Sequence, residues 1–201
     1  HPEDNIIFVG GTGLYLKAAL FNYQFNPESS ITNDYNELSN DQLYRLALKK
    51  DANVSIHPNN RQRMIRFLNK TLTNQPDPKE IYKALFIGLT TDRSNLYQRI
   101  NERVEVMIQD GLIDEAKGLY DKHIDCKSLK TAIGYKELFG YFNNEYSLEE
   151  AITLIKKRSR HYAKRQYTWF NHQMSIKWFE TDYNNFANTI NAVDNYIKKE
   201  H

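Results

Sequence analysis

Apolar residues recur with helical spacing over most of the chain. The clearest stripe predicts a helix over residues 94–109 and consists of Leu96, Ile100, Val104, Met107 and Ile108, which repeat about every 3.6 residues. Asp110-Gly111 follows this stripe and is typical of a helix end. Shorter stripes predict further helices at about 14–21, 43–47, 61–70, 112–122, 135–142 and 147–170.

Two short apolar runs are typical of buried strands instead. Residues 6–9 are β-branched and aromatic and end at Gly10-Gly11, and residues 84–89 form a second run. Between them, residues 22–40 are polar and predict a loop, and Pro76 and Pro78 interrupt the chain. Two strands among six or seven helices predict an α/β fold with a large helical share.

The composition of the 201 residues is globular, with 40% hydrophobic and 26% charged residues. The single Cys126 excludes an internal disulfide and paired-cysteine zinc ligands, which favours a reducing compartment. No stretch approaches the roughly 18 apolar residues of a membrane span, and no signal-peptide pattern opens the chain. We therefore expect a cytoplasmic protein with no membrane partner.

Charge is placed unevenly, although the formal net charge is only +2. No Asp or Glu lies between Glu150 and Glu180. The cations of that stretch are Lys156, Lys157, Arg158, Arg160, Lys164, Arg165 and Lys177. Ser147 and Glu150 have the spacing of a capping box, which predicts that a helix begins at Ser147 and carries most of these cations.

This basic helix has two interpretations. Its apolar residues share one face and are Leu148, Ala151, Ile152, Ile155, Tyr162, Trp169 and Phe170. A solvated polar face explains most charge runs, but such faces usually pair Glu with Lys one turn apart. The absence of acids favours contact with a nucleic-acid backbone, with Tyr167 and Trp169 stacking on bases or lying in the core.

Two other basic sets are more ambiguous. Arg61 and Arg63 lie in the first turn of a predicted helix, where the helix dipole disfavours cations, so a bound polyanion or a nearby carboxylate would compensate equally well. Arg99 and Arg103 lie one turn apart and could clamp a diphosphate. Spacing alone favours pairing of these two with Glu102 or Glu105.

The chain resembles the bacterial tRNA dimethylallyltransferase family in five segments, which occur in the same order. They are GGTGLYLKA from Gly10, IHPNNRQRMIR from Ile56, LYQRINERVEVMIQDGLIDEAKGL from Leu96, AIGYKEL from Ala132 and YAKRQYTWF from Tyr162. The glycine turn itself is not a Walker A loop. Because the segments span almost the whole chain, the resemblance is specific.

The resemblance implies transfer of a dimethylallyl group from dimethylallyl diphosphate to N6 of the adenosine just 3′ of the anticodon, with Mg²⁺ assisting the departure of diphosphate. It implies a P-loop-kinase-like parallel sheet core, formed by residues 1–21 and 56–201 with C-terminal helices. It also implies a helical insertion at residues 22–55 on the side of the tRNA anticodon arm. We expect a monomer whose Mg²⁺ ligands lie mostly outside this chain.

Residue roles follow from the same resemblance. Arg103 matches an arginine that contacts the diphosphate, with Arg99 as a second candidate, and Thr12 matches a threonine at the reacting adenosine. Thr12 and Arg103 are therefore the candidate catalytic residues. Besides Thr12, the predicted tRNA contacts are Arg61, Gln62, Arg63, Met64, Ile65, Arg66, Thr131, Ala132, Ile133, Gly134, Tyr135, Lys136, Lys164, Arg165, Gln166, Tyr167, Thr168, Trp169, Phe170 and Asn171.

The family's phosphate-binding P-loop and the aspartate thought to act as general base precede the glycine turn, and this chain begins after them. The chain by itself is therefore expected to bind RNA without catalysing transfer. Two alternatives remain open. One is a noncatalytic RNA-binding module, and the other is a nucleotide-kinase relative, which would share the core architecture.

Overall fold

The computed structural model describes residues 6–23, 33–69, 78–124 and 126–200. Contacts between Cα atoms divide the chain into two compact units. The larger unit comprises His1–Gly13 and Ala84–His201, and the smaller unit comprises Leu14–Lys83. Each unit has a hydrophobic core of its own, so each is described separately.

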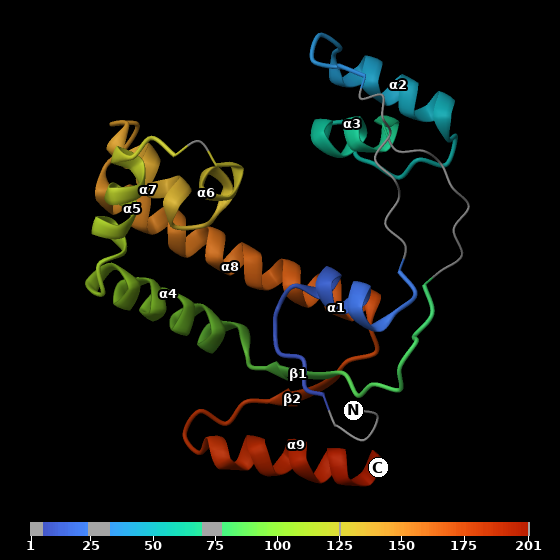
Figure 1. The fold of residues 1–201 in the computed structure, drawn as a ribbon, viewed down its shortest axis with the longest axis vertical. Helices are drawn as coiled ribbons and strands as arrows, with labels where there is room; N and C mark the ends of the chain where they lie inside the picture. The colour runs from blue at the N-terminus through green and yellow to red at the C-terminus, as the bar shows by residue number, and fades with distance from the viewer. Residues whose placement is uncertain (1–5, 24–32, 70–77, 125, 201) are drawn as a thin grey trace. The chain divides into compact units, whose positions relative to one another are not determined.

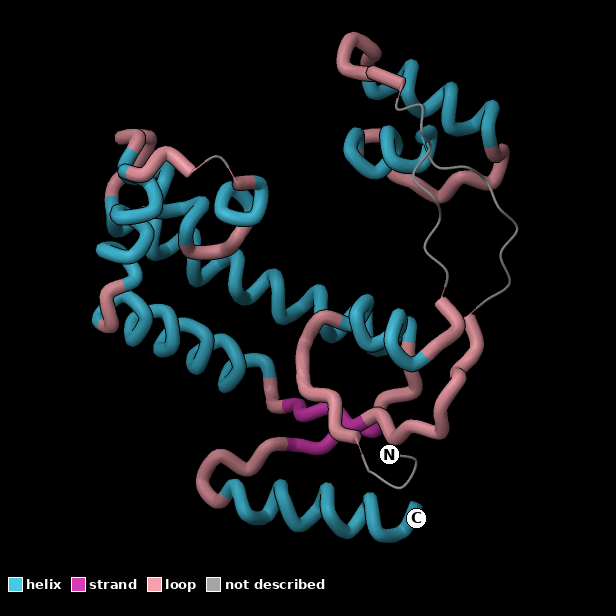
Figure 2. Tube along the Cα trace, in the orientation of Figure 1, coloured by secondary structure: helices cyan, strands magenta, loops and turns pink. Residues whose placement is uncertain are grey.

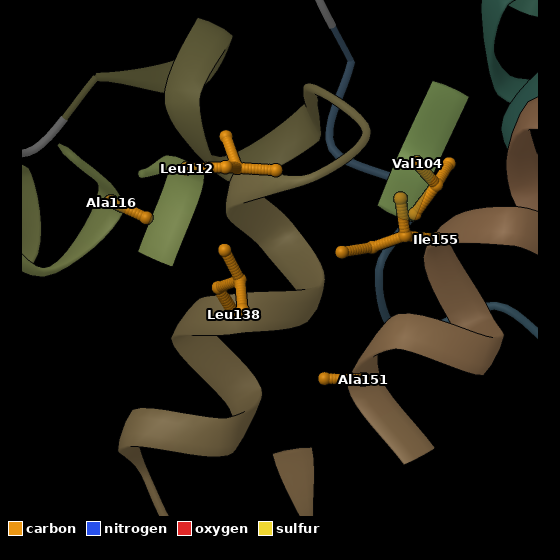
Figure 3. Packing of buried hydrophobic residues seen from close by; sticks show 6 residues of the cluster. All are labelled: Val104, Leu112, Ala116, Leu138, Ala151 and Ile155. Atoms are coloured by element: carbon orange, nitrogen blue, oxygen red, sulfur yellow. The ribbon is translucent and has the colours of Figure 1, made fainter. Parts of the chain in front are cut away.

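Five helices of the larger unit pack together (Figure 1). They are α4 (Arg93–Gln109), α5 (Leu112–Asp121), α6 (Lys127–Thr131), α7 (Tyr135–Phe142) and α8 (Leu148–Gln173). Their shared core consists of Val104, Leu112, Ala116, Leu138, Ala151 and Ile155, which converge from α4, α5, α7 and α8 (Figure 3). The predicted stripe of α4 is therefore confirmed at Val104, while Met107 and Ile108 pack at the edge of this core.

The start of α8 follows the predicted capping box. The Ser147 hydroxyl accepts a hydrogen bond from the Glu150 amide at 3.2 Å, and the Ser147 amide donates to Glu150 Oε2 at 2.8 Å. The hydrogen bonds from Ser147, its backbone amide first, hold the pKa of Glu150 below its ordinary value. Local sequence therefore suffices to place this helix end.

Two strands form a parallel pair at the end of the larger unit opposite α5 (Figure 1). β1 (Ile87–Thr90) pairs with β2 (Lys177–Glu180), and Gly88 lies opposite Trp178. α9 (Phe186–Glu200) packs on β2, with the rings of Phe179 and Tyr196 5.6 Å apart. β1 confirms the strand predicted at 84–89 with shifted ends, whereas β2, α6 and α9 were not predicted.

The strand predicted at residues 6–9 is wrong. These residues form no strand, as Figure 2 shows, and Ile7 and Val9 are 85% and 93% exposed. A strand needs hydrogen bonds to a neighbour, and among the described residues β1 and β2 pair only with each other. An apolar run identifies a strand only when a partner edge lies beside it.

The smaller unit contains α1 (Gly13–Leu20, whose first residue belongs to the larger unit), α2 (Asn40–Lys50) and α3 (Arg61–Asn69). Its core consists of Leu43 from α2, Ile56 from the segment between the two helices, and Met64 from α3. α3 therefore belongs with α2, and the structure divides the chain after residue 83 rather than after residue 55. Part of the predicted 22–40 loop, and Pro76, lie outside the described residues.

Candidate functional site

The glycine turn at residues 10–13 lies against the C-terminal half of α8. Gln166 Nε2 donates a hydrogen bond to the backbone oxygen of Gly11 at 2.9 Å. A Cβ at Gly11 would overlap the Gln166 amide, and one at Gly13 would overlap the Trp169 ring. The close approach of the Trp169 ring thus favours glycine at residue 13, whereas a side chain at residue 11 would displace the Gln166 amide. Thr12, between them, is exposed.

One part of the predicted contact stretch on α8 packs inside the larger unit. The Tyr167 ring stacks on Trp178 of β2 with centroids 4.9 Å apart, and the Tyr167 hydroxyl donates to Thr90 Oγ1 of β1. Trp178 Nε1 donates to Asn171 Oδ1 at 2.9 Å. These contacts give Tyr167 and Asn171 a structural role in joining α8 to the strands.

The other part of the same stretch faces solvent. Lys164, Arg165 and Thr168 are exposed, and Thr168 Oγ1 bonds only to the backbone oxygen of Lys164 within the described residues. Arg165 lies over the ring of Tyr162, 5.6 Å from its centroid. Tyr162, expected on the apolar face, is 41% exposed. Arg165 therefore lies beside an exposed aromatic ring, and Lys164 is its exposed neighbour in sequence.

Three of the four cations in the first half of α8 have acidic or polar partners on other helices, while the fourth, Lys157, is exposed. Lys156 pairs with Glu105 of α4, and Arg158 pairs with the fully buried Glu137 of α7. Arg160 Nη1 donates to Asn101 Oδ1. The absence of acids within the helix was therefore a misleading signal for these three cations, because their partners lie 51, 21 and 59 residues away in sequence.

The predicted contact stretch 131–136 forms the turn between α6 and α7. Gly134 has φ of 103°, which other residues rarely adopt, and its amide donates to Glu137 Oε2 at 2.8 Å. Ile133 packs against the core, and Ala132 is half-buried. Only Thr131 and Lys136 are exposed.

Tyr135 completes this turn by bonding to α5. Its hydroxyl donates to Glu115 Oε1 at 2.6 Å, and this hydrogen bond, with burial, raises the pKa of Tyr135 above its ordinary value. Glu137 was missed as a positioning group by sequence reasoning. Glu137 lies three residues after Gly134, which precedes the helix, and this capping-box spacing was the sequence signal that could have identified it.

Arg99 and Arg103 lie on α4 without the predicted intrahelical partners. Glu102 accepts a hydrogen bond from Gln98 Nε2 at 2.8 Å, and Glu105 is taken by Lys156. The Arg99 guanidinium lies 4.0 Å from the centroid of the Tyr183 ring.

Around Arg99, one face of α4 and residues 181–184 line a polar cavity of about 320 Å³. Arg103, one turn further along α4, is exposed and makes no hydrogen bond or ion pair within the part of the chain that the structure describes. Arg103 does not line this cavity, whose lining includes the carboxylates of Glu102 and Asp182. The exposed Arg103 guanidinium by itself is suited to an anionic ligand.

Residues 61–66 lie in the smaller unit, and some of them pack or bond inside it while others are exposed. Arg61 donates hydrogen bonds to the backbone oxygens of Tyr35 at 2.6 Å and Asn36 at 2.8 Å. These carbonyl oxygens stabilise the positive charge that the helix dipole disfavours in the first turn of α3. Met64 is fully buried and Ile65 packs beside it. Gln62, Arg63 and Arg66 are exposed, and the two arginines line a cavity of about 350 Å³ with Asp51.

Comparison with known proteins identifies close relatives of this chain. A sequence profile described as IPP transferase matches residues 2–173. The tRNA dimethylallyltransferase of Geobacillus kaustophilus is 42% identical in an alignment of 221 residues that covers 95% of this chain and 67% of that protein. The Bacillus subtilis tRNA dimethylallyltransferase is also 42% identical, over 87% of this chain and 61% of that protein.

Solved structures agree with the sequence comparison. The tRNA Δ(2)-isopentenylpyrophosphate transferase of Staphylococcus epidermidis matches with a TM-score of 0.62 at 30% identity, over 94% of this chain and 68% of that one. The full-length tRNA isopentenylpyrophosphate transferase of Bacillus halodurans matches with a TM-score of 0.61 at 38% identity, over 94% and 64%. The chain thus spans about two thirds of the length of its relatives.

Proposed function

Because the chain belongs to the IPP transferase family, we propose that it transfers a dimethylallyl group from dimethylallyl diphosphate to N6 of the adenosine just 3′ of the anticodon in tRNA. The family match over residues 2–173 carries this proposal. The packing of the glycine turn on α8 supports it, since it joins the turn that contains Thr12 to the helix that carries the exposed Lys164 and Arg165. The parallel pairing of β1 and β2 is in keeping with a P-loop-kinase-like core.

We assign the RNA contacts to the predicted residues whose side chains are accessible. Besides Thr12 at the reacting base, and Asn171, whose side chain is bonded to Trp178, these are on the larger unit Thr131, Lys136, Lys164, Arg165 and Thr168. Lysine and arginine neutralise phosphates and release their counterions, which favours binding of any RNA backbone. The larger unit therefore supplies affinity through the exposed side of α8 and through the turn between α6 and α7. Arg63 and Arg66 supply further cations on the smaller unit.

The reaction breaks the bond between the allylic carbon and a diphosphate oxygen, which leaves as diphosphate, while N6 forms its bond to that carbon. N6 passes a proton to a general base, the role that the family resemblance gives to an aspartate. N6 of adenine is a weak nucleophile, so the base must leave the stack and be held in line with the carbon. In this proposal Thr12 hydrogen-bonds the reacting adenosine. The Arg103 guanidinium stabilises the negative charge that develops on the departing diphosphate.

The IPP transferase family uses Mg²⁺, which would neutralise part of the diphosphate charge. Among the described residues, no group of three or more His, Cys, Asp or Glu side chains could hold a metal ion. Within the same residues, no helix has the length and apolar character that a membrane span requires.

Arg103→Ala in the complete protein tests the proposed chemistry. Turnover should fall by about a hundredfold, because the lost contact strengthens only as charge develops on the leaving group. The dissociation constant for an anticodon-arm RNA should change by less than about twofold, since Arg103 is not assigned to RNA.

The matched control is Gln109→Ala, an exposed change at the end of the same helix, which should leave turnover unchanged. Unchanged turnover in Arg103→Ala would remove this residue from the site. RNA binding without any transfer by the parent protein would favour the noncatalytic alternative.

A further inference from the structure

We propose that Gln166 and Trp169 are positioning residues that hold Thr12 at the reacting adenosine, and that they do not contact tRNA themselves. This inference rests on the proposed function. The motif that contains them was expected as one continuous RNA-binding stretch. The structure instead places the two side chains against the backbone of a turn that lies more than 150 residues earlier in sequence.

The first observation is how few contacts hold the turn. Residues 6–9, which lead into it, form no strand and are exposed. Within the described part of the chain, the bond from Gln166 Nε2 to the Gly11 oxygen is the one side-chain hydrogen bond made by residues 6–12. Gly11 and Gln166 are both half-buried, so water competes only partly for this bond.

The second observation is the fit of the Trp169 ring. It occupies the space that a side chain at residue 13 would need, and it meets the Phe170 ring edge to face at 5.2 Å. The turn is therefore held on one side of Thr12 by a hydrogen bond and on the other by an indole ring. Thr12 itself stays exposed, so its hydroxyl is available to a ligand.

The third observation is the arrangement along α8. Residues three apart share a face of a helix, so Gln166 and Trp169 point to the same side. Lys164 and Thr168, four apart, share another face and are exposed. One helix thus holds Thr12 with one face and presents cations with another. This arrangement sets the distance between the bound RNA and the residue at the reacting base.

The effect on the reaction follows from the geometry of in-line transfer. A displacement of about 1 Å in a reacting group can cost about a hundredfold in rate, even when binding is unchanged. Loss of the Gln166 bond leaves the ring contact in place, so the turn gains freedom without being released. We therefore expect a smaller loss for Gln166→Ala, about tenfold in kcat, with KM for RNA unchanged.

The experiment is a double-mutant cycle in the complete protein, using Gln166→Ala, Thr12→Val and the double variant. If Gln166 acts through Thr12, Gln166→Ala should lower kcat in the parent background and have little further effect in Thr12→Val. Gln166→Glu keeps the shape of the glutamine side chain but lacks the Nε2 hydrogen-bond donor, so it should behave like Gln166→Ala. The control is Thr153→Ala, an exposed change in the first half of α8 at a residue with no assigned contact, which should leave kcat unchanged.

A second readout does not depend on transfer. An anticodon-arm RNA with 2-aminopurine at the reacting position becomes brighter when that base leaves the stack. Gln166→Ala should reduce this signal while the dissociation constant and its salt dependence stay the same. Thermal unfolding of each variant checks that the fold is intact.

Three results would overturn the inference. They are additive effects in the cycle, a raised KM for RNA with kcat intact, and an unchanged 2-aminopurine signal in Gln166→Ala. The parent protein could raise the 2-aminopurine fluorescence but transfer no dimethylallyl group. In that case the proposed function fails, while the inference that the turn positions the base stands. If the parent protein does neither, both fail.

Discussion

Replacement of Arg158 by Met tests whether a buried carboxylate ties α7 to α8. The Glu137 side chain is fully buried, and its two oxygens accept hydrogen bonds from the Arg158 guanidinium and from the Gly134 amide. Methionine keeps most of the apolar stem of arginine but removes the charge. The variant therefore leaves a buried carboxylate with a single donor, which is the costly way to break such a pair.

The expected loss follows from the burial of the two partners. Breaking a buried ion pair by removing one partner typically costs about 3–5 kcal/mol. The Arg158 side chain is 38% exposed, so water can replace part of what it supplies. We therefore expect the free energy of unfolding of the larger unit to fall by about 2–3 kcal/mol, below that range.

Urea unfolding followed by tryptophan fluorescence measures this loss, because both tryptophans, Trp169 and Trp178, lie in the larger unit. The matched control is Lys156→Met, two residues earlier on the same helix. Its partner Glu105 is 52% exposed, so the control should lose less than about 1 kcal/mol. Equal losses in the two variants would refute the reasoning, since it attributes the larger loss to the burial of Glu137.

Three further predictions concern other parts of the structure. Lys164→Ala with Arg165→Ala should weaken binding of an anticodon-arm RNA and lower its salt dependence by about two phosphate equivalents, as measured by fluorescence anisotropy over a range of salt. Gly134→Ala should lower the free energy of unfolding by about 1–3 kcal/mol, because φ of 103° strains any side chain. Hydrogen bonds, that from the Asn185 amide first, hold the pKa of Asp182 below its ordinary value. The stability that this carboxylate contributes is therefore present above its unfolded pKa and is lost as pH falls through the folded pKa. Asp182→Asn and the parent should converge in unfolding experiments as the pH falls through that folded pKa.

Each of these has a result that would contradict it. An unchanged salt slope would remove the two cations from the RNA contact. Gly118→Ala is the control for the glycine change, because Gly118 lies in α5 with open space around its Cα and should gain stability by about 0.5–1 kcal/mol. If both glycine variants changed in the same direction, backbone strain at Gly134 would not be the cause. A stability difference for Asp182→Asn that persists in acid would contradict its depressed pKa.

The helices with strong local signals could be predicted from the sequence. α4, α5, α7 and α8 begin and end within a few residues of the predicted bounds, because apolar periodicity, a capping box and the Asp110-Gly111 stop are all short-range features. The strands were harder. β2 is only four residues long, and residues 6–9 have the composition of a strand but no partner among the described residues. Strand formation depends on a neighbour that local sequence does not reveal.

The sequence by itself determined that α8 is basic, that its first turn is capped and that two glycines lie beside Thr12. Only the tertiary structure decided which cations are available. Arg158 is paired with a buried acid from α7, while Lys164 and Arg165 remain exposed. The physical reason is that a cation's role depends on the charges and the solvent around it, and those come from residues far away in the chain. Likewise, the sequence of α8 alone predicts a surface position for Gln166. Its hydrogen bond to the Gly11 oxygen exists only because the fold brings the two residues together.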